Sequence, residues 1–246
     1  MTPTPSRVRP RTPQEMFDRA APYYDRFNSL LSMGSDRRWR RAVAREVDPL
    51  RRPRVLDVAT GTGSVALAIV EQARRTGGRA SVWGVDLNAA MLAVARRRTA
   101  AATSGSVHLV RAAAHRIPFP DQSFDAATIA FAIDDVEERE ECGRELFRVL
   151  RPGGRLIVLE LGLPPGPVMG RLYQGVLALM SLAGRIRRVD GYRHLREEIS
   201  TYRGADAVRD LLTGVGFGGY RRRLLTRGIA VLHVAERPDT RTSGRE

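Results

Sequence analysis

The chain has 246 residues, of which 43% are hydrophobic and 28% charged, and its formal charge is +14. This length suits one large α/β domain, and the single cysteine, Cys142, excludes a disulfide-rich fold. All 41 basic residues are arginine and are spread along the chain. That spread favours a compositional bias over a nucleic-acid surface and leaves attraction to an anionic membrane surface as the alternative. No apolar run reaches the length of a membrane span and no signal peptide is evident, so we expect a cytoplasmic protein.

The two ends of the chain differ in composition from its middle. Residues 1–12 and 237–246 are rich in Arg, Pro and Thr and are predicted to be disordered tails. The single domain between them is expected to span residues 13–236. Its first part, residues 13–50, has apolar residues at helical spacing and predicts helices that cap the edge of the sheet on which a cofactor binds. We interpret three aromatic residues of this part, Phe17, Phe27 and Trp39, as core.

A strand, a tight turn and a helix organise the rest of the sequence. The apolar run at residues 55–58 predicts a buried strand, and a helical pattern begins near residue 65. Gly61 and Gly63 permit positive φ between them and leave room for a ligand to cross the strand end. Asp86 ends the next apolar run, about 20 residues later, where a carboxylate can accept both hydroxyls of an adenosine ribose. The sequence therefore predicts a nucleoside-cofactor site.

The glycine pattern alone also fits a dinucleotide-binding enzyme. Asp57 at the strand end and the polar run at residues 121–125 make the sequence resemble the class I methyltransferases, which use S-adenosylmethionine. This resemblance implies an α/β, Rossmann-like fold with a seven-stranded, mostly parallel sheet and a terminal antiparallel strand pair. The cofactor-binding residues that it implies are Asp57, Gly61, Thr62, Gly63, Asp86, Ala113, Ala114 and Ala130.

The helical N-terminal part carries a more specific pattern. From Tyr24 to Trp39 the chain follows the spacing Tyr-Asp-x-x-Asn-x-x-x-Ser-x-Gly-x-x-x-x-Trp. This spacing resembles that of the quinone-pathway C-methyltransferases, which methylate demethylmenaquinone or the benzoquinol precursor of ubiquinone. Asp36 stands where that family usually has histidine. The resemblance implies substrate contacts from residues of this segment and of a later Asp-x-Tyr motif, namely Tyr24, Asn28, Tyr192 and His194.

Two further departures from the family lie near the expected site. The family usually has Asn or Asp at the position of Ala113, so only backbone could hold the adenine there. A strand predicted at residues 124–133 leads to Asp134 and Asp135, which replace an Arg-Asn pair of the family. Asp134 fits either a helix N-cap or a catalytic group, and Asp135 fits a cap, because acidic residues that suit a helix N-terminus follow.

The remaining elements complete the sheet. A helix, a glycine turn at Gly153 and a fifth strand are predicted around residues 146–160. Residues 168–188 predict a helix with a wide apolar face, which would either line a groove for a prenyl tail or pack in the core. A helix near residues 205–213 and two strands at 220–225 and 229–234 end the domain.

Methyl transfer from a sulfonium needs placement of the nucleophile and exclusion of water, and no metal. A quinol ring carbon becomes nucleophilic when the adjacent hydroxyl loses its proton, so a base is required. The candidates are Asp134 and His115, then His194 and Tyr24. Three functions stay open: methylation of a prenylated quinol, with peripheral contact at the inner membrane face; methylation of another small molecule; and cofactor binding without catalysis. We expect no nucleic-acid partner, and the oligomeric state is left open.

Overall fold

The structure, a computed structural model, describes residues 17–18, 20–47, 52–102, 106–136, 138–162 and 204–239. Several sequence-based expectations lie outside these residues. They are the tails at residues 1–12 and 240–246, the apolar helix at 168–188, and the substrate contacts Tyr192 and His194.

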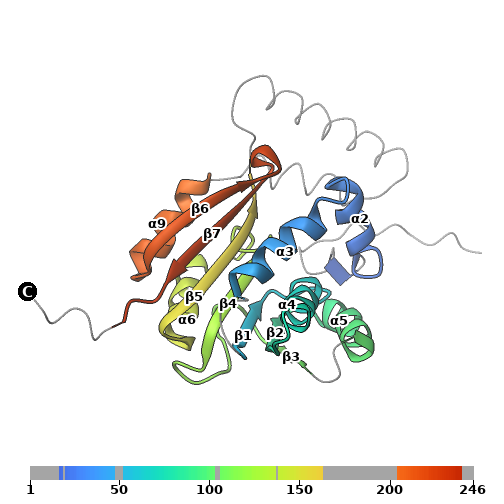
Figure 1. The fold of residues 1–246 in the computed structure, drawn as a ribbon, viewed down its shortest axis with the longest axis horizontal. Helices are drawn as coiled ribbons and strands as arrows, with labels where there is room; N and C mark the ends of the chain where they lie inside the picture. The colour runs from blue at the N-terminus through green and yellow to red at the C-terminus, as the bar shows by residue number, and fades with distance from the viewer. Residues whose placement is uncertain are drawn as a thin grey trace, which may run out of the picture.

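A single mixed sheet forms the centre of the described part of the chain, with the strand order β3-β2-β1-β4-β5-β7-β6 (Figure 1). The strands are β1 Arg54–Val58, β2 Ser81–Asp86, β3 Val107–Arg111, β4 Phe124–Ala130, β5 Leu150–Leu161, β6 Gly218–Leu225 and β7 Ala230–Glu236. Strands β1 to β5 run parallel to one another, and β7 lies antiparallel between β5 and β6. The expected class I methyltransferase architecture is confirmed.

Helices cover both faces of this sheet because its central strands are apolar on both sides. The helices are α2 Tyr24–Leu31, α3 Asp36–Val47, α4 Ser64–Arg75, α5 Ala89–Ala102, α6 Arg139–Val149 and α9 Ala205–Val215. In β1, Val55 packs with α3 and α4, whereas Leu56 packs with α6 and α9 on the other face. Figure 1 shows these two helix layers with the sheet between them. The carboxyl ends of the parallel strands are therefore left for a ligand.

The sequence predicted that residues 13–50 form helices that cap the edge of the sheet. Within the described residues, these helices do more than that. Helix α3 packs on the sheet: Trp39 is buried, as expected, and its Nε1 donates a hydrogen bond to Thr226 Oγ1 at 2.7 Å. Val43 and Val47 join the same core. The N-terminal segment is thus part of the domain core and is fixed to the C-terminal strands.

The chain leaves β4 earlier than predicted. The strand ends at Ala130 instead of residue 133, because Phe131 has φ 56° and its N–H bonds to the carbonyl of Leu159 at 2.7 Å. A turn follows, and α6 begins only at Arg139 with Glu138 in the N-cap position. The interpretation of Asp134 and Asp135 as caps of this helix is therefore wrong.

The predicted C-terminal tail also begins too early. The Arg237 N–H donates to the carbonyl of Gly154 at 2.8 Å, and the Gly153 N–H donates to the carbonyl of Arg237 at 2.8 Å. The Arg237 guanidinium also donates to backbone carbonyls at the end of α6 and lies 4.6 Å from the ring centre of Phe147. The glycine turn predicted at Gly153 is an irregularity within β5. The backbone of Arg237 is hydrogen-bonded to Gly153 and Gly154 at this irregularity.

Candidate active site

A cavity of about 540 Å³ lies at the carboxyl ends of β1, β2 and β4. The predicted site residues that line it are Tyr24, Asn28, Asp57, Gly61, Thr62, Asp86, Ala113, Ala114, His115 and Ala130. Residues that are distant in sequence are thus brought together as the resemblance implied. Phe17 also faces the cavity, so its interpretation as core is wrong; its ring packs edge-on against Tyr24 with centroids 6.1 Å apart.

The glycine turn after β1 and the tip of β2 are joined by one carboxylate. Asp86 accepts the N–H of Gly61 at 2.7 Å and the N–H of Asn88 at 2.8 Å. Gly61 and Gly63 have φ of 54° and 77°, and a Cβ on Gly63 would lie 3.3 Å from Thr99. Burial raises the pKa of Asp86. A fixed, partly desolvated carboxylate at this position can accept ribose hydroxyls, as predicted.

Asp57 is the most deeply buried acid of the site. It is 1% exposed and accepts hydrogen bonds from the hydroxyls of Thr60 and Thr128, both at 2.6 Å. Burial raises its pKa to about 6, although these two hydroxyls oppose the shift. A carboxylate that has lost its hydration is best compensated by a cation. The site therefore fits a ligand that carries both a nucleoside and a positive charge, as S-adenosylmethionine does.

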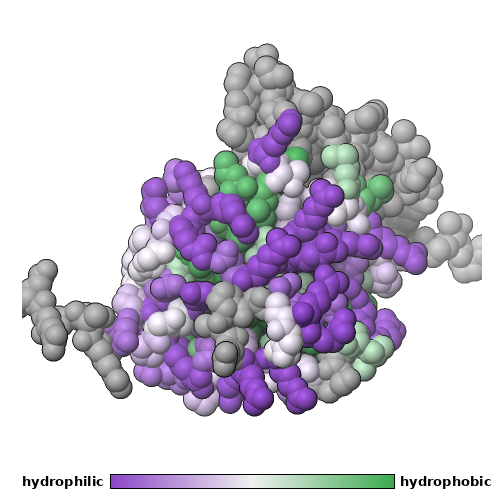
Figure 2. All heavy atoms as spheres, in the orientation of Figure 1, coloured by the Kyte–Doolittle hydropathy of each residue, from purple (hydrophilic) through white to green (hydrophobic). Residues whose placement is uncertain are grey.

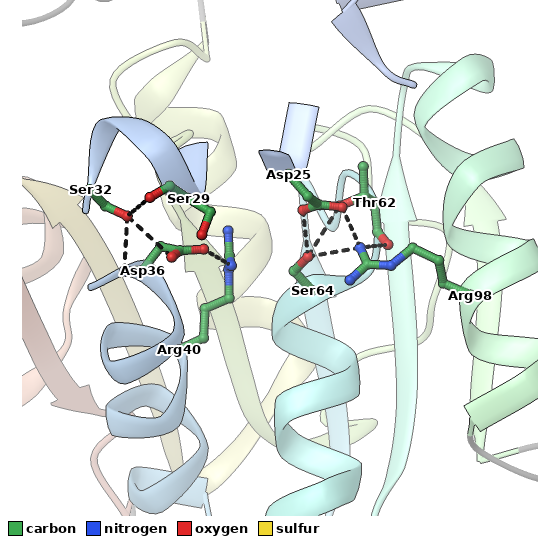
Figure 3. Close-up of polar contacts among 8 residues, drawn as sticks. All are labelled: Asp25, Ser29, Ser32, Asp36, Arg40, Thr62, Ser64 and Arg98. Atoms are coloured by element: carbon green, nitrogen blue, oxygen red, sulfur yellow. Dashed lines mark hydrogen bonds and ion pairs between the residues drawn. The ribbon is translucent and has the colours of Figure 1, made fainter. Parts of the chain in front are cut away.

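Helix α2 is tied to the glycine turn by a polar network that the sequence did not predict (Figure 3). Asp25 Oδ1 accepts hydrogen bonds from Thr62 at 2.9 Å and Ser64 at 2.8 Å, and Oδ2 accepts one from Arg98 at 2.7 Å. Arg98 also donates to the carbonyl of Thr62 at 2.8 Å. The Tyr-Asp pair of the N-terminal pattern was the available signal, but the partners of Asp25 come from the glycine turn, α4 and α5. The network fixes the turn under the cofactor site.

Replacing Arg98 with methionine should weaken cofactor binding about tenfold, because the turn loses a charged donor that bonds the Thr62 carbonyl and the Asp25 carboxylate. The effect is modest since the Arg98 and Asp25 side chains are 35% and 31% exposed. Titration calorimetry with S-adenosylmethionine would measure it. The matched control is Arg97→Met, an exposed position on the same helix; equal affinities of the two variants would contradict the role of the network.

The segments that follow β3 and β4 also bring titratable groups to the cavity. His115 Nδ1 lies 2.9 Å from Glu138 Oε2, and both residues line the cavity together with Asp135. Asp134, the first candidate base from sequence, does not line the cavity and instead lies 2.9 Å from the guanidinium of Arg139. The structure thus places His115 at the site and Asp134 beside it. Glu138 was not singled out from the sequence, because its approach to His115 depends on the turn after β4.

Comparison with known proteins identifies close relatives. The model of the ubiE/COQ5 methyltransferase family matches residues 7–237. A ubiquinone/menaquinone biosynthesis C-methyltransferase UbiE from Geotalea daltonii is 37% identical over 91% of this chain and 95% of its own length. A demethylmenaquinone methyltransferase from Thermus thermophilus is 42% identical over 91% of this chain and 100% of its own length.

Solved structures share the fold at lower identity. A protein of Methanococcus maripaludis assigned as an S-adenosylmethionine-dependent methyltransferase has a TM-score of 0.68 at 16% identity, covering 96% of this chain and 99% of its own. A phosphoethanolamine N-methyltransferase of Haemonchus contortus in complex with S-adenosylmethionine has a TM-score of 0.57 at 17% identity, covering 80% and 52%. These likenesses support the fold described above.

The cofactor expected from the sequence, S-adenosylmethionine, and the expected class of enzyme, a methyltransferase, are both confirmed. The role of each individual site residue stays a prediction, and the geometry of the cavity supports it. The fold, the cavity and the relatives agree, and the chain belongs to the ubiE/COQ5 methyltransferase family.

Proposed function

We propose that this enzyme methylates a ring carbon of a prenylated quinol, either demethylmenaquinol or the ubiquinone precursor. The observation that carries the proposal is the cavity itself. Aromatic side chains of Phe17, Tyr24 and Phe131 line it together with the His115–Glu138 pair, next to the cofactor-binding turn. The names of the relatives point to the same acceptors.

The donor would be held by residues on the β1 and β2 side of the cavity. Asp86 receives the ribose hydroxyls, the turn from Gly61 to Gly63 passes under the methionine part, and Asp57 supplies negative charge nearby. When bound, S-adenosylmethionine supplies a methyl group activated by its sulfonium. The backbone at Ala113 and Ala114 flanks the adenine, since neither side chain can bond to it.

Asp86→Ala should lower the affinity for S-adenosylmethionine by about 2 to 4 kcal/mol, because one or two charge-assisted hydrogen bonds are lost. Calorimetry on the folded variant would measure this. Asp210→Ala removes an exposed acid of α9 and is the control. Unchanged affinity of the Asp86 variant, or tight NAD binding by the wild type, would contradict the assignment.

The acceptor would be activated by His115. With Nδ1 beside Glu138, the other ring nitrogen of His115 is left for the hydroxyl of the quinol, and the carboxylate orients the imidazole. Removal of the hydroxyl proton raises the electron density of the adjacent ring carbon. Enclosure of the ring by the apolar lining of the cavity would exclude water, which favours carbon over solvent as the nucleophile.

The test of the acceptor is an assay of purified enzyme with S-adenosylmethionine and demethylmenaquinols of increasing tail length. We expect a methylated quinol, with an affinity that rises well beyond tenfold for each added prenyl unit, since each buried methylene adds about 0.8 kcal/mol at most. Transfer that ignores tail length would instead favour another small-molecule acceptor. Cofactor binding without any transfer would favour a non-catalytic relative.

We further propose that α2 and α3 rest on an anionic membrane, where a prenylated quinol resides. Three apolar or aromatic side chains at α2 are exposed: Tyr23 just before the helix, Leu30 within it and Met33 after it are 67%, 62% and 78% exposed. The adjoining helix α3 exposes Arg37 and Arg38, and Figure 2 shows hydrophilic side chains over α3 with hydrophobic ones near α2. Within the described residues, no helix is long and apolar enough to cross a membrane.

Sedimentation with lipid vesicles would test this contact. Binding should require anionic lipid and weaken with salt, at about 1 kcal/mol for each arginine near the surface. The double variant Arg37→Glu, Arg38→Glu should bind less than the wild type. Its control is Arg74→Glu, Arg75→Glu on α4, where both arginines already pair with Glu71. Equal binding to neutral vesicles would contradict the proposal.

A further inference from the structure

The cavity is lined by acids far more than by bases. Among the described residues that line it are the carboxylates of Asp25, Asp57, Asp86, Asp135 and Glu138. Although the chain is rich in arginine, the described lining includes one arginine, Arg40 of α3. The presence of one guanidinium among these carboxylates suggests that it has a specific role in binding a ligand.

The side chain of Arg40 is held in place by a hydrogen-bonded chain of Asp36 and Ser32 (Figure 3). Its side chain is 12% exposed, and its Nη1 donates to Oδ2 of Asp36, one helical turn earlier. Asp36 is 3% exposed and is itself fixed by Ser32, whose hydroxyl donates to Oδ1 at 3.1 Å and accepts the Asp36 N–H at 3.2 Å. Trp39, beside Arg40 in sequence, anchors the helix to Thr226. The guanidinium is thus positioned at the cavity before any ligand arrives.

A guanidinium has five N–H donors, and one of them is used by Asp36 in the described structure. The others are available to a ligand oxygen. Such a group is a strong hydrogen-bond partner for an oxyanion, and it acts most strongly where water is scarce. Surrounding carboxylates would repel an anionic ligand everywhere else in the cavity.

We propose that Arg40 binds the oxyanion of the acceptor, the ring hydroxyl after it has lost its proton. This assignment rests on the proposed function. It adds which residue binds the negative charge on the ring oxygen of the acceptor. The proton leaves to the base or to water, and the negative oxygen then forms a charge-assisted hydrogen bond with the Arg40 guanidinium. Arg40 is thereby an acceptor-binding residue that favours the ionised, nucleophilic form of the ring.

The test uses two stable ring probes and needs no turnover. One is 2-hydroxy-1,4-naphthoquinone, which is an anion at neutral pH; the other is 2-methoxy-1,4-naphthoquinone, which is neutral and similar in shape. Visible absorption and calorimetry measure their binding to the wild type, to Arg40→Met and Arg40→Lys, and to the control Arg41→Met, an exposed position next in the helix. Thermal midpoints and S-adenosylmethionine affinity check that each variant is folded.

We expect the wild type and Arg41→Met to bind the anion at least tenfold more tightly than the neutral ring. Arg40→Met should lose this preference while its affinity for the neutral ring changes less than threefold, and Arg40→Lys should keep part of it. A preference that survives in folded Arg40→Met overturns the proposal. Equal binding of both rings by the wild type also overturns the proposal. This second outcome keeps the test decisive if the methionine variant does not fold. Failure of quinol methylation, by contrast, would appear in the separate transfer assay.

Discussion

Turnover should fall about 100-fold to 10,000-fold when His115 is replaced by glutamine, while the affinity for S-adenosylmethionine stays nearly unchanged. The reason is that the variant lacks the group that accepts the proton of the acceptor hydroxyl in the transition state, whereas the residues on the cofactor side of the cavity are unchanged. Single-turnover rates with a short-chain demethylmenaquinol, together with calorimetry for the cofactor, would separate the two quantities.

Two other variants make this result specific. Glu138→Gln should give an intermediate loss, because it keeps the shape of the partner of His115 but removes its charge. Asp134→Asn should stay within a few-fold of the wild type, since Asp134 lies beside Arg139 and outside the cavity lining. A large loss in Asp134→Asn with a mild effect in His115→Gln would return the catalytic role to Asp134, as the sequence first suggested.

Glu160→Gln should make the stability of the protein much less sensitive to a rise in pH from about 5 to about 8. Glu160 is 6% exposed, and its Oε1 accepts the N–H groups of Ala132 and Ile133, both at 3.0 Å. Burial, aided by the charges of Asp134 and Asp135, raises its pKa from 4.5 to about 8. Glutamine keeps the accepting oxygen and cannot ionise.

The direction of the effect follows from proton linkage. Because the folded state holds the proton of Glu160 more tightly, the stability from this group is complete below pH 4.5 and is lost as pH rises through about 8. Relative to the variant, the wild type should therefore lose about 4 kcal/mol of unfolding free energy between pH 5 and pH 9. Urea unfolding at a series of pH values would measure it, with Glu140→Gln on the exposed face of α6 as the control. Parallel curves for wild type and Glu160→Gln would contradict the buried, protonated state.

The sequence predicted the fold well because its central signals are local. The apolar run of β1, the glycines after it and the start of α4 are set by backbone preferences within a dozen or so residues. The same holds for Asp86, whose position at the end of β2 follows from the strand itself. These elements appeared where they were expected, and most of the residues predicted to bind the cofactor line one cavity at their ends.

The acceptor side could not be predicted as well because it depends on contacts between distant segments. The left-handed conformation of Phe131 and the hold of Glu160 on Ala132 and Ile133 turn the chain after β4. That turn moves Asp134 out of the cavity and brings Glu138 to His115. No local pattern distinguishes this arrangement from a helix that begins at Asp134, and the acidic run that follows favours the helix.

The place of β7 between β5 and β6 has a consequence for how the protein is made. Until residues 230–236 have left the ribosome, β5 has an unpaired edge, and α3 lacks Leu232 and Val234 as core neighbours. The cofactor turn and β1 to β4 come from the first part of the chain. Helix α3, synthesised before all of them, gains its hydrogen bond to Thr226 and its packing against β7 only after those residues are present. The nascent chain can therefore form the cofactor-binding turn early, whereas the packing of the helix that carries Arg40 is completed only once β7 has been made.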